Sequence, residues 1–190
     1  MARFFPRVNK EAVPSMVFVD GENLAVRYGN LLRSKSESAP THVIYEPGVY
    51  VWSTGLNNIC YWNGVIRRHY YTSVGGDAAK ITETIDMLKA AGIQAPNVFK
   101  KTKNKGSKRV DISLATDMLT HAARKNYEIA VLVAGDEDYV PLVEAVKGEG
   151  RRVVLWFVSD GLSPSLKRAA DFFAPLDEVL LSPNIDPGWK

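Results

Sequence analysis

The sequence predicts a three-layer α/β/α fold with a mostly parallel central sheet. Short apolar runs without polar alternation recur at residues 15–20, 130–134 and 151–158, as is typical of strands buried on both faces. Helix-like spacing of apolar residues follows such runs, and this strand–helix alternation is the pattern of βαβ units. At 190 residues, the chain is long enough for one domain with a sizeable core.

The composition is that of an ordinary globular protein, with 46% hydrophobic and 24% charged residues. No apolar run approaches the ~20 residues of a membrane span, and the first residues lack the apolar region of a secretory signal. Cys60 is the single cysteine, which excludes an intramolecular disulfide and a Cys-rich zinc site. The three histidines show no ligand spacing. We therefore expect a cytoplasmic protein that does not interact with membranes.

We expect residues 1–14 to form an N-terminal arm, 15–181 a single domain and 182–190 a C-terminal tail. The strand at 15–20 ends in an acid and a glycine, and a helix follows it. Residues 33–64 are less clear, because a polar loop-like stretch precedes an aromatic segment at 45–62 that fits strand and helix equally. We interpret this insertion as a packed flap, in preference to a base-stacking platform for single-stranded nucleic acid.

The middle of the chain continues the alternation. A strand rich in β-branched and aromatic residues is predicted at 65–72, and Asp77 is expected to cap a helix that ends at Gly92. A short strand at 97–100 leads into a basic loop at 100–109. The next helix, 110–123, has an apolar stripe that we assign to Ile112, Ala115, Leu119 and Ala122, with Leu114 and Met118 beside it.

The last third contains the strand at 130–134, its helix through residue 148, and a buried strand at 151–158. A short helix is predicted at 163–170. We assign residues 179–181 to a final edge strand.

Aspartates follow the predicted strands at equivalent places. Asp20 ends the first strand, Asp111 begins the helix after the basic loop, and Asp136 and Asp138 follow the strand at 130–134. Any one of them alone is as well explained as a helix cap, since Asp is a favoured N-cap. Together they point to one ligand site, because ligands of open α/β sheets bind at the carboxyl ends of the strands.

Four carboxylates in one place repel one another unless a cation neutralises them. Ligand oxygens without His or Cys select a hard ion, so the expected cofactor is Mg²⁺ or Mn²⁺. Such ions assist phosphodiester hydrolysis. Asp117 lies six residues after Asp111, roughly 120° around and 9 Å along a helix, so we expect it to support the site rather than to share an ion.

Residues 100–109 hold six basic residues in ten and no acid, which is the electrostatic pattern of phosphate-backbone binding as well as of a solvated loop. Other phosphate sites are missing from the sequence. It contains no P-loop motif and no dinucleotide-binding glycine motif. The motifs of haloacid-dehalogenase phosphatases and of receiver domains are not convincing either.

Three stretches resemble the NYN domain family, a branch of the PIN-like nucleases. They are Val-Asp-Gly-Glu-Asn-Leu at 19–24, Lys-Arg-Val-Asp-Ile-Ser-Leu-Ala-Thr-Asp at 108–117, and Ala-Gly-Asp-Glu-Asp-Tyr-Val-Pro-Leu at 134–142. The resemblance covers about residues 17–157 in order. Two positions depart from the family pattern, with Ala134 in place of a frequent Ser or Thr and Tyr139 in place of the commoner Phe.

This resemblance implies a PIN-like fold and a metal-dependent ribonuclease. It implies metal ligation and catalysis by Asp20, Asp111, Asp136 and Asp138, with Asn23 orienting a carboxylate or a metal-bound water and Asp117 in support. On this reading, single-stranded or structured RNA is the partner, and its phosphates contact Lys101, Lys103, Lys105, Lys108 and Arg109. Two alternatives stay open: a non-catalytic RNA-binding module, which Ala134 supports, and a DNA-directed nuclease. A homodimer also stays open.

Overall fold

The computed structural model describes residues 13–57, 64–101 and 106–182. Of the predicted arm and tail, only residues 13, 14 and 182 fall within these ranges. Within them, no helix is long and apolar enough to cross a membrane.

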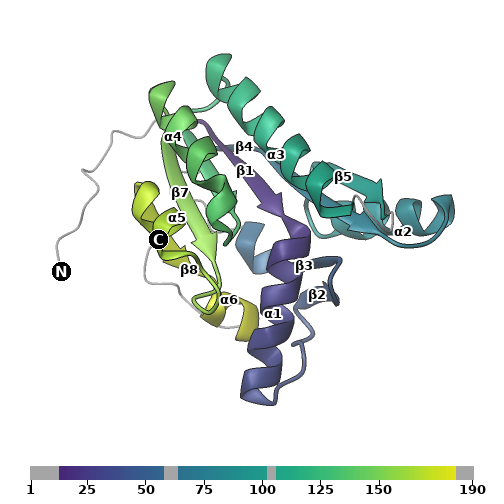
Figure 1. Ribbon diagram of the computed structural model, residues 1–190. Helices are drawn as coiled ribbons and strands as arrows, with labels where there is room; N and C mark the ends of the chain where they lie inside the picture. The colour runs from purple at the N-terminus through teal and green to yellow at the C-terminus, as the bar shows by residue number, and fades with distance from the viewer. Residues whose placement is uncertain (1–12, 58–63, 102–105, 183–190) are drawn as a thin grey trace.

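The centre of the molecule is a six-stranded sheet in the order β5-β4-β1-β6-β7-β8 (Figure 1). Every neighbouring pair in it is parallel. From β1 the chain adds β4 and β5 on one side, then returns to add β6, β7 and β8 on the other. The strand order therefore reverses between β1 and β6. The strands are β1 Ser15–Asp20, β4 Val65–Val74, β5 Ala95–Lys100, β6 Ile129–Val133, β7 Arg152–Phe157 and β8 Phe172–Pro175.

Helices cover both faces of the sheet, so the predicted three-layer α/β/α fold is confirmed (Figure 1). Val17 and Val19 of β1 face one core, and Met16 and Phe18 face the other, as the two-residue period of a strand requires. The first core is covered by α1 Gly21–Lys35, α2 Ala78–Ala90 and α6 Asp177–Leu181. The second core is covered by α3 Gly106–Ala123, α4 Val140–Gly148 and α5 Pro164–Ala169.

The aromatic insertion begins as an antiparallel hairpin of β2 Val43–Glu46 and β3 Tyr50–Ser53, followed by the 3₁₀ turn η1 Thr54–Asn57. Trp52 is fully buried, and the Tyr70 hydroxyl of β4 both donates to the Val51 carbonyl and accepts from its N–H. This part of the insertion is a packed flap, as predicted. Tyr61 and Trp62 lie outside the described residues.

The predicted N-cap of α2 is confirmed, since the Asp77 carboxylate accepts from the backbone N–H of Lys80. The predicted basic loop is shorter than expected. Lys100 ends β5 and α3 begins at Gly106, so Asp111 lies in the second turn of α3 and not at its start.

The predicted apolar face of α3 was wrong at Ile112 and Leu119. The buried positions are Val110, Leu114, Met118 and Ala122, while Ile112 is 65% and Leu119 is 38% exposed. Both stripes have helical spacing, and the structure selects the one whose residues pack with Phe18 and Tyr71 on the sheet.

The predicted edge strand at 179–181 was also wrong. These residues belong to α6, and the edge strand is β8 at 172–175. A three-residue apolar run does not distinguish a strand from a helix. Here the helical form buries Val179 and Leu180 in the first core and lets the Tyr28 hydroxyl donate to the Leu180 carbonyl.

His69 of β4 gives the fold a pH-dependent stability. Its ring stacks on Phe18, and burial, with help from the nearby His121, lowers its pKa to about 4. Because the unfolded state then binds the proton more readily, stability is complete above pH 6.5 and falls as the pH drops towards 4. We predict that His69→Phe removes much of this loss, since the Nε2 atom of His69 has no hydrogen-bond partner among the described residues.

Thermal unfolding of both proteins between pH 8 and pH 4 measures the effect. His42, which is partly exposed, provides the control. His42→Gln should retain the wild-type pH dependence, and equal pH profiles for wild type and His69→Phe would contradict the prediction.

Candidate functional site

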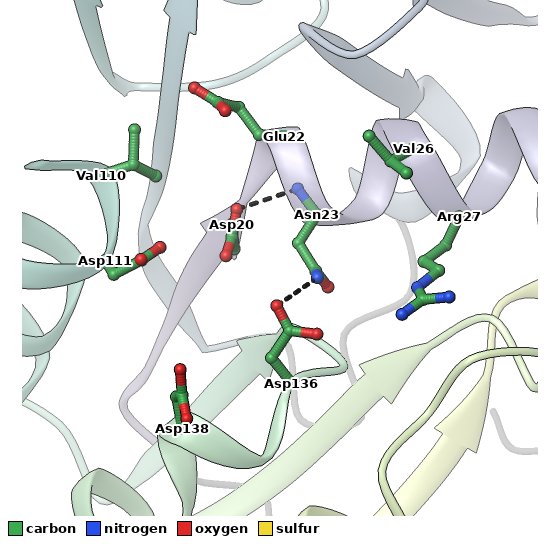
Figure 2. Close-up of a pocket in the computed structure, with 9 residues that line it drawn as sticks. All are labelled: Asp20, Glu22, Asn23, Val26, Arg27, Val110, Asp111, Asp136 and Asp138. Carbon is green, nitrogen blue, oxygen red and sulfur yellow. Dashed lines mark hydrogen bonds between the residues drawn. The ribbon is translucent and has the colours of Figure 1, made fainter. Parts of the chain in front are cut away.

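The four predicted aspartates meet at the point where the strand order reverses. Asp20 ends β1, Asp136 and Asp138 follow β6, and Asp111 comes from α3. They line one open cavity of about 490 Å³, together with Glu22, Asn23, Val26, Arg27 and Val110. In Figure 2 these aspartates surround the centre of the cavity. This is the position at which open α/β sheets bind their ligands.

Asp20 is both a helix cap and the most buried member of this group, with 3% of its surface exposed. Its Oδ1 atom accepts from the backbone N–H of Asn23 at 3.1 Å, which caps α1. Its Oδ2 atom accepts from the Tyr139 hydroxyl at 2.9 Å. The pKa of Asp20 is raised to about 7, mainly by burial and also by the charges of Asp111 and Asp136, against the lowering effect of these hydrogen bonds. Asp20 therefore both caps α1 and lines the cavity.

Asn23 connects the first turn of α1 to the turn after β6. Its Nδ2 donates to Asp136 Oδ2 at 2.7 Å (Figure 2), and its Oδ1 accepts from the Gly135 N–H at 2.9 Å. Asp136 makes no side-chain cap hydrogen bond to the following 3₁₀ turn η2, Glu137–Tyr139. Its carboxylate is thus positioned by Asn23 and not by a capping role.

Gly135 allows this turn to pack closely against the neighbouring strand. A Cβ atom at this position would lie 2.1 Å from Cε1 of Phe157 in β7. The absence of a side chain therefore lets the turn that carries Asp136 and Asp138 pass directly against the next strand.

Tyr139 joins two of the acids, a role that sequence reasoning missed. Its hydroxyl lies 2.9 Å from Asp20 Oδ2 and 3.3 Å from Asp111 Oδ1, and the residue is 4% exposed. Burial raises the pKa of Tyr139, so the hydroxyl keeps its proton and donates to one carboxylate at a time. Burial also raises the pKa of Asp111, and the charges of Glu22, Asp136 and Asp138 add to that rise. The sequence signal that could have indicated this role was the presence of tyrosine where the family pattern more commonly has phenylalanine.

Two charged residues of α1 also line the cavity and were not among the predicted site residues. Glu22 accepts from the Ser73 hydroxyl and forms an ion pair with Lys101 at 3.6 Å, which brings the end of the basic segment to the cavity rim. Arg27 follows Asn23 by four residues, and this spacing places both side chains on one helix face. Arg27 lies over Gly161, where an added Cβ would come within 2.7 Å of it, and it forms no ion pair with the residues that the structure describes.

The remaining predicted residues are placed less centrally. Asp117 accepts from the Tyr71 hydroxyl of β4 at 2.7 Å and does not line the cavity. The Arg109 guanidinium lies 4.7 Å from the centre of the Phe99 ring. Lys103, Lys105 and the side chain of Lys108 lie outside the described residues.

The chemistry of the cavity suits a hard divalent cation. Its donors include carboxylate oxygens, and burial together with the neighbouring acids raises the pKa values of Asp20 and Asp111. Over the described ranges, no three His, Cys, Asp or Glu side chains are placed so that they would together hold an ion. The Asp20 oxygen engaged by Tyr139 is one that a metal would have to share or take over.

Comparison with known families identifies the domain. The model of the NYN domain family matches residues 14–177, which includes all four aspartates. The chain belongs to the NYN domain family. The resemblance inferred from the three motifs is therefore confirmed, and membership supports a PIN-like nuclease fold and a hydrolase role.

The solved structures support the fold of this NYN domain. It resembles the crystal structure of a Vibrio parahaemolyticus protein of unknown function, with a TM-score of 0.67 and 17% sequence identity. The match covers 92% of this chain and 99% of the Vibrio chain. No curated protein matches the sequence significantly.

The raised pKa of Asp20 predicts how the metal-free NYN domain responds to pH. Since its folded pKa of about 7 exceeds the ordinary value of 3.8, the folded state binds the proton more tightly. The stabilisation is full below pH 3.8 and is lost as the pH rises through 7. Asp20→Asn should therefore raise stability at pH 8, by on the order of 3 kcal/mol, and should have little effect near pH 4.

Chemical unfolding in EDTA at the two pH values tests this. The control is Asp86→Asn on the exposed side of α2, which should change stability little at either pH. A destabilising effect of Asp20→Asn at pH 8 would contradict the account of a strained, buried carboxylate.

Proposed function

We propose that this NYN domain is a metal-dependent ribonuclease that hydrolyses RNA phosphodiester bonds in the aspartate cavity. The observation that carries the proposal is the convergence of Asp20, Asp111, Asp136 and Asp138 on one open cavity at the carboxyl ends of β1 and β6. Gathering these carboxylates is unfavourable without a cation. A stabilising counter-ion is therefore the simplest reason for their arrangement.

The four aspartates would hold Mg²⁺ or Mn²⁺. Such an ion, when bound, supplies charge neutralisation at the phosphate and activation of a water molecule. The other residues position the carboxylates. Asn23 holds Asp136 by one oxygen, and the hydroxyl of the buried Tyr139 holds Asp20 and Asp111.

The charges around the cavity suit a polyanionic substrate. The acids repel phosphates in the absence of a cation, so nucleic-acid binding in the cavity should depend on divalent metal. Basic residues flank the acids on two sides. Lys101 pairs with Glu22 of the cavity lining, and Arg27 of α1 lines the cavity itself. A phosphate backbone crossing the cavity would meet cations on either side of the reacting group.

Cleavage of labelled single-stranded RNA tests the proposal directly. We predict that wild type cuts with Mn²⁺ or Mg²⁺ and not with EDTA, and that Asp136→Asn and Asp138→Asn lose more than about 100-fold in rate. Mn²⁺ should also raise the melting temperature of wild type but not of the variants, because only a ligand that binds the folded state stabilises it.

The matched control is again Asp86→Asn, an exposed acid on α2 that should leave both effects intact. An excess of DNA of the same sequence shows whether the cavity prefers RNA. Undiminished cleavage by both cavity variants would exclude this cavity as the active site.

A non-catalytic RNA-binding module is the second candidate, and one contact favours it. The Tyr139 hydroxyl donates to Asp20 Oδ2, so a metal at this carboxylate would compete with that hydrogen bond. This candidate predicts RNA binding without turnover in wild type, and it predicts that Tyr139→Phe raises the affinity for Mn²⁺. The ribonuclease proposal predicts turnover in wild type.

Arg27 should contact phosphate. We predict that Arg27→Gln weakens RNA binding several-fold and reduces the salt dependence of log K by roughly one counter-ion. Arg152→Gln serves as the control, because Arg152 is exposed at the amino end of β7, opposite the cavity. Fluorescence anisotropy over a range of salt concentrations measures both slopes, and equal slopes for the two variants would rule out the contact.

A further inference from the structure

A second, smaller pocket adjoins the aspartate cavity on the side of α3 and α4. Its volume is about 190 Å³. It shares Asp111, Asp136 and Asp138 with the larger cavity, so the two lie side by side. Its other walls are apolar or aromatic and come from Ile112, Ala115, Tyr139 and Leu142.

The orientation of α3 creates this pocket. Burial of the stripe that contains Val110 and Leu114 turns Ile112 outward, and 65% of its surface is exposed beside Asp111. A single exposed isoleucine is ordinary on a protein surface. Here it forms the wall of a pocket whose rim is made of three carboxylates of the proposed active site.

We propose that this pocket binds one nucleobase of the substrate, next to the phosphate that lies at the aspartates. The proposal rests on the proposed function, because it places the polynucleotide in the adjoining cavity. In a nucleic acid, each phosphate is flanked by nucleosides, so a chain held at Asp111, Asp136 and Asp138 brings a base to one side of them. The apolar pocket lies on such a side and shares these residues with the cavity.

The size and chemistry of the pocket fit a planar ring. A protein cavity of roughly 150 Å³ accommodates benzene, so 190 Å³ is sufficient for a single six-membered ring. The walls offer aliphatic contact to the ring face, and the Tyr139 hydroxyl is already engaged by Asp20. Base identity is therefore read weakly, whereas an unpaired and unstacked base is required, because a base within a duplex exposes no free face.

The cleavage pattern of an RNA that carries one abasic residue tests the subsite within the intact chain. In wild type, the bond next to the abasic sugar should be cut about tenfold more slowly than the same bond in the complete RNA, which corresponds to about 1.4 kcal/mol. Bonds farther away should be unaffected. In Ile112→Ser, all bonds should be cut more slowly, and the local effect of the abasic residue should disappear.

Met87→Ser is the matched control, because Met87 is an exposed apolar residue on α2 and lines neither pocket. It should preserve the wild-type pattern. An abasic effect of equal size in wild type and Ile112→Ser would overturn the subsite, and so would a wild type that ignores the missing base. The second result is also the one expected if the pocket receives a side chain of a partner protein.

Binding provides a readout that is independent of cleavage. A tetranucleotide with a non-hydrolysable backbone and its fully abasic counterpart are titrated against each protein in the presence of Mn²⁺. Wild type and Met87→Ser should prefer the complete tetranucleotide, and Ile112→Ser should lose this preference. A preserved difference in a protein that does not cleave would support the subsite and refute the proposed function. Cleavage without any such difference would refute the subsite alone.

Discussion

The desolvated carboxylate of Asp20 is the constraint on which the site depends. β1 is central in the sheet, so an acid at its last position lies between strands and beneath helices, with 3% of its surface exposed. Burial, with a smaller contribution from the other acids of the cavity, raises its pKa to about 7. A fold selected only for stability would place a neutral residue there. The free-energy cost of burying this carboxylate is explained if its charge is needed to hold a cation, because functional sites are where proteins retain such unfavourable groups.

Two side chains make this arrangement tolerable. Asn23 binds the turn after β6 through Gly135 and Asp136, and Tyr139 binds Asp20 and Asp111 through one hydroxyl. Segments more than a hundred residues apart in sequence are thereby fixed to one another at the reversal of the strand order. The same contacts keep the carboxylates in place without neutralising them. The segments that carry the carboxylates are thus fixed before any ligand arrives, which reduces the ordering cost of binding. The carboxylates themselves still have to close around an ion.

Much of this was predictable because it depends on local patterns. Buried parallel strands give apolar runs, and acids at their carboxyl ends must share one rim, so Asp20 and Asp136 could be assigned to one site. Contacts between segments that are distant in the sequence produce no such local pattern. Two stripes of α3 have the same helical periodicity, and only packing against the sheet determines which of them is buried. This packing leaves Ile112 exposed. Arg27 and the hydroxyl of Tyr139 acquire their roles only from the neighbours that the fold supplies.

The central claim is that the four aspartates form a divalent cation site. Anomalous diffraction from crystals grown with Mn²⁺, compared with crystals grown in EDTA, tests it most directly. The account predicts one peak, or a pair ~4 Å apart, within the cavity between Asp20, Asp111, Asp136 and Asp138. It also predicts that the Tyr139 hydroxyl moves away from Asp20 or shares its oxygen with the ion. The crystals should contain Mn²⁺ at a concentration above which the melting temperature of the protein no longer changes. The absence of an anomalous peak from the cavity under these conditions would contradict the claim.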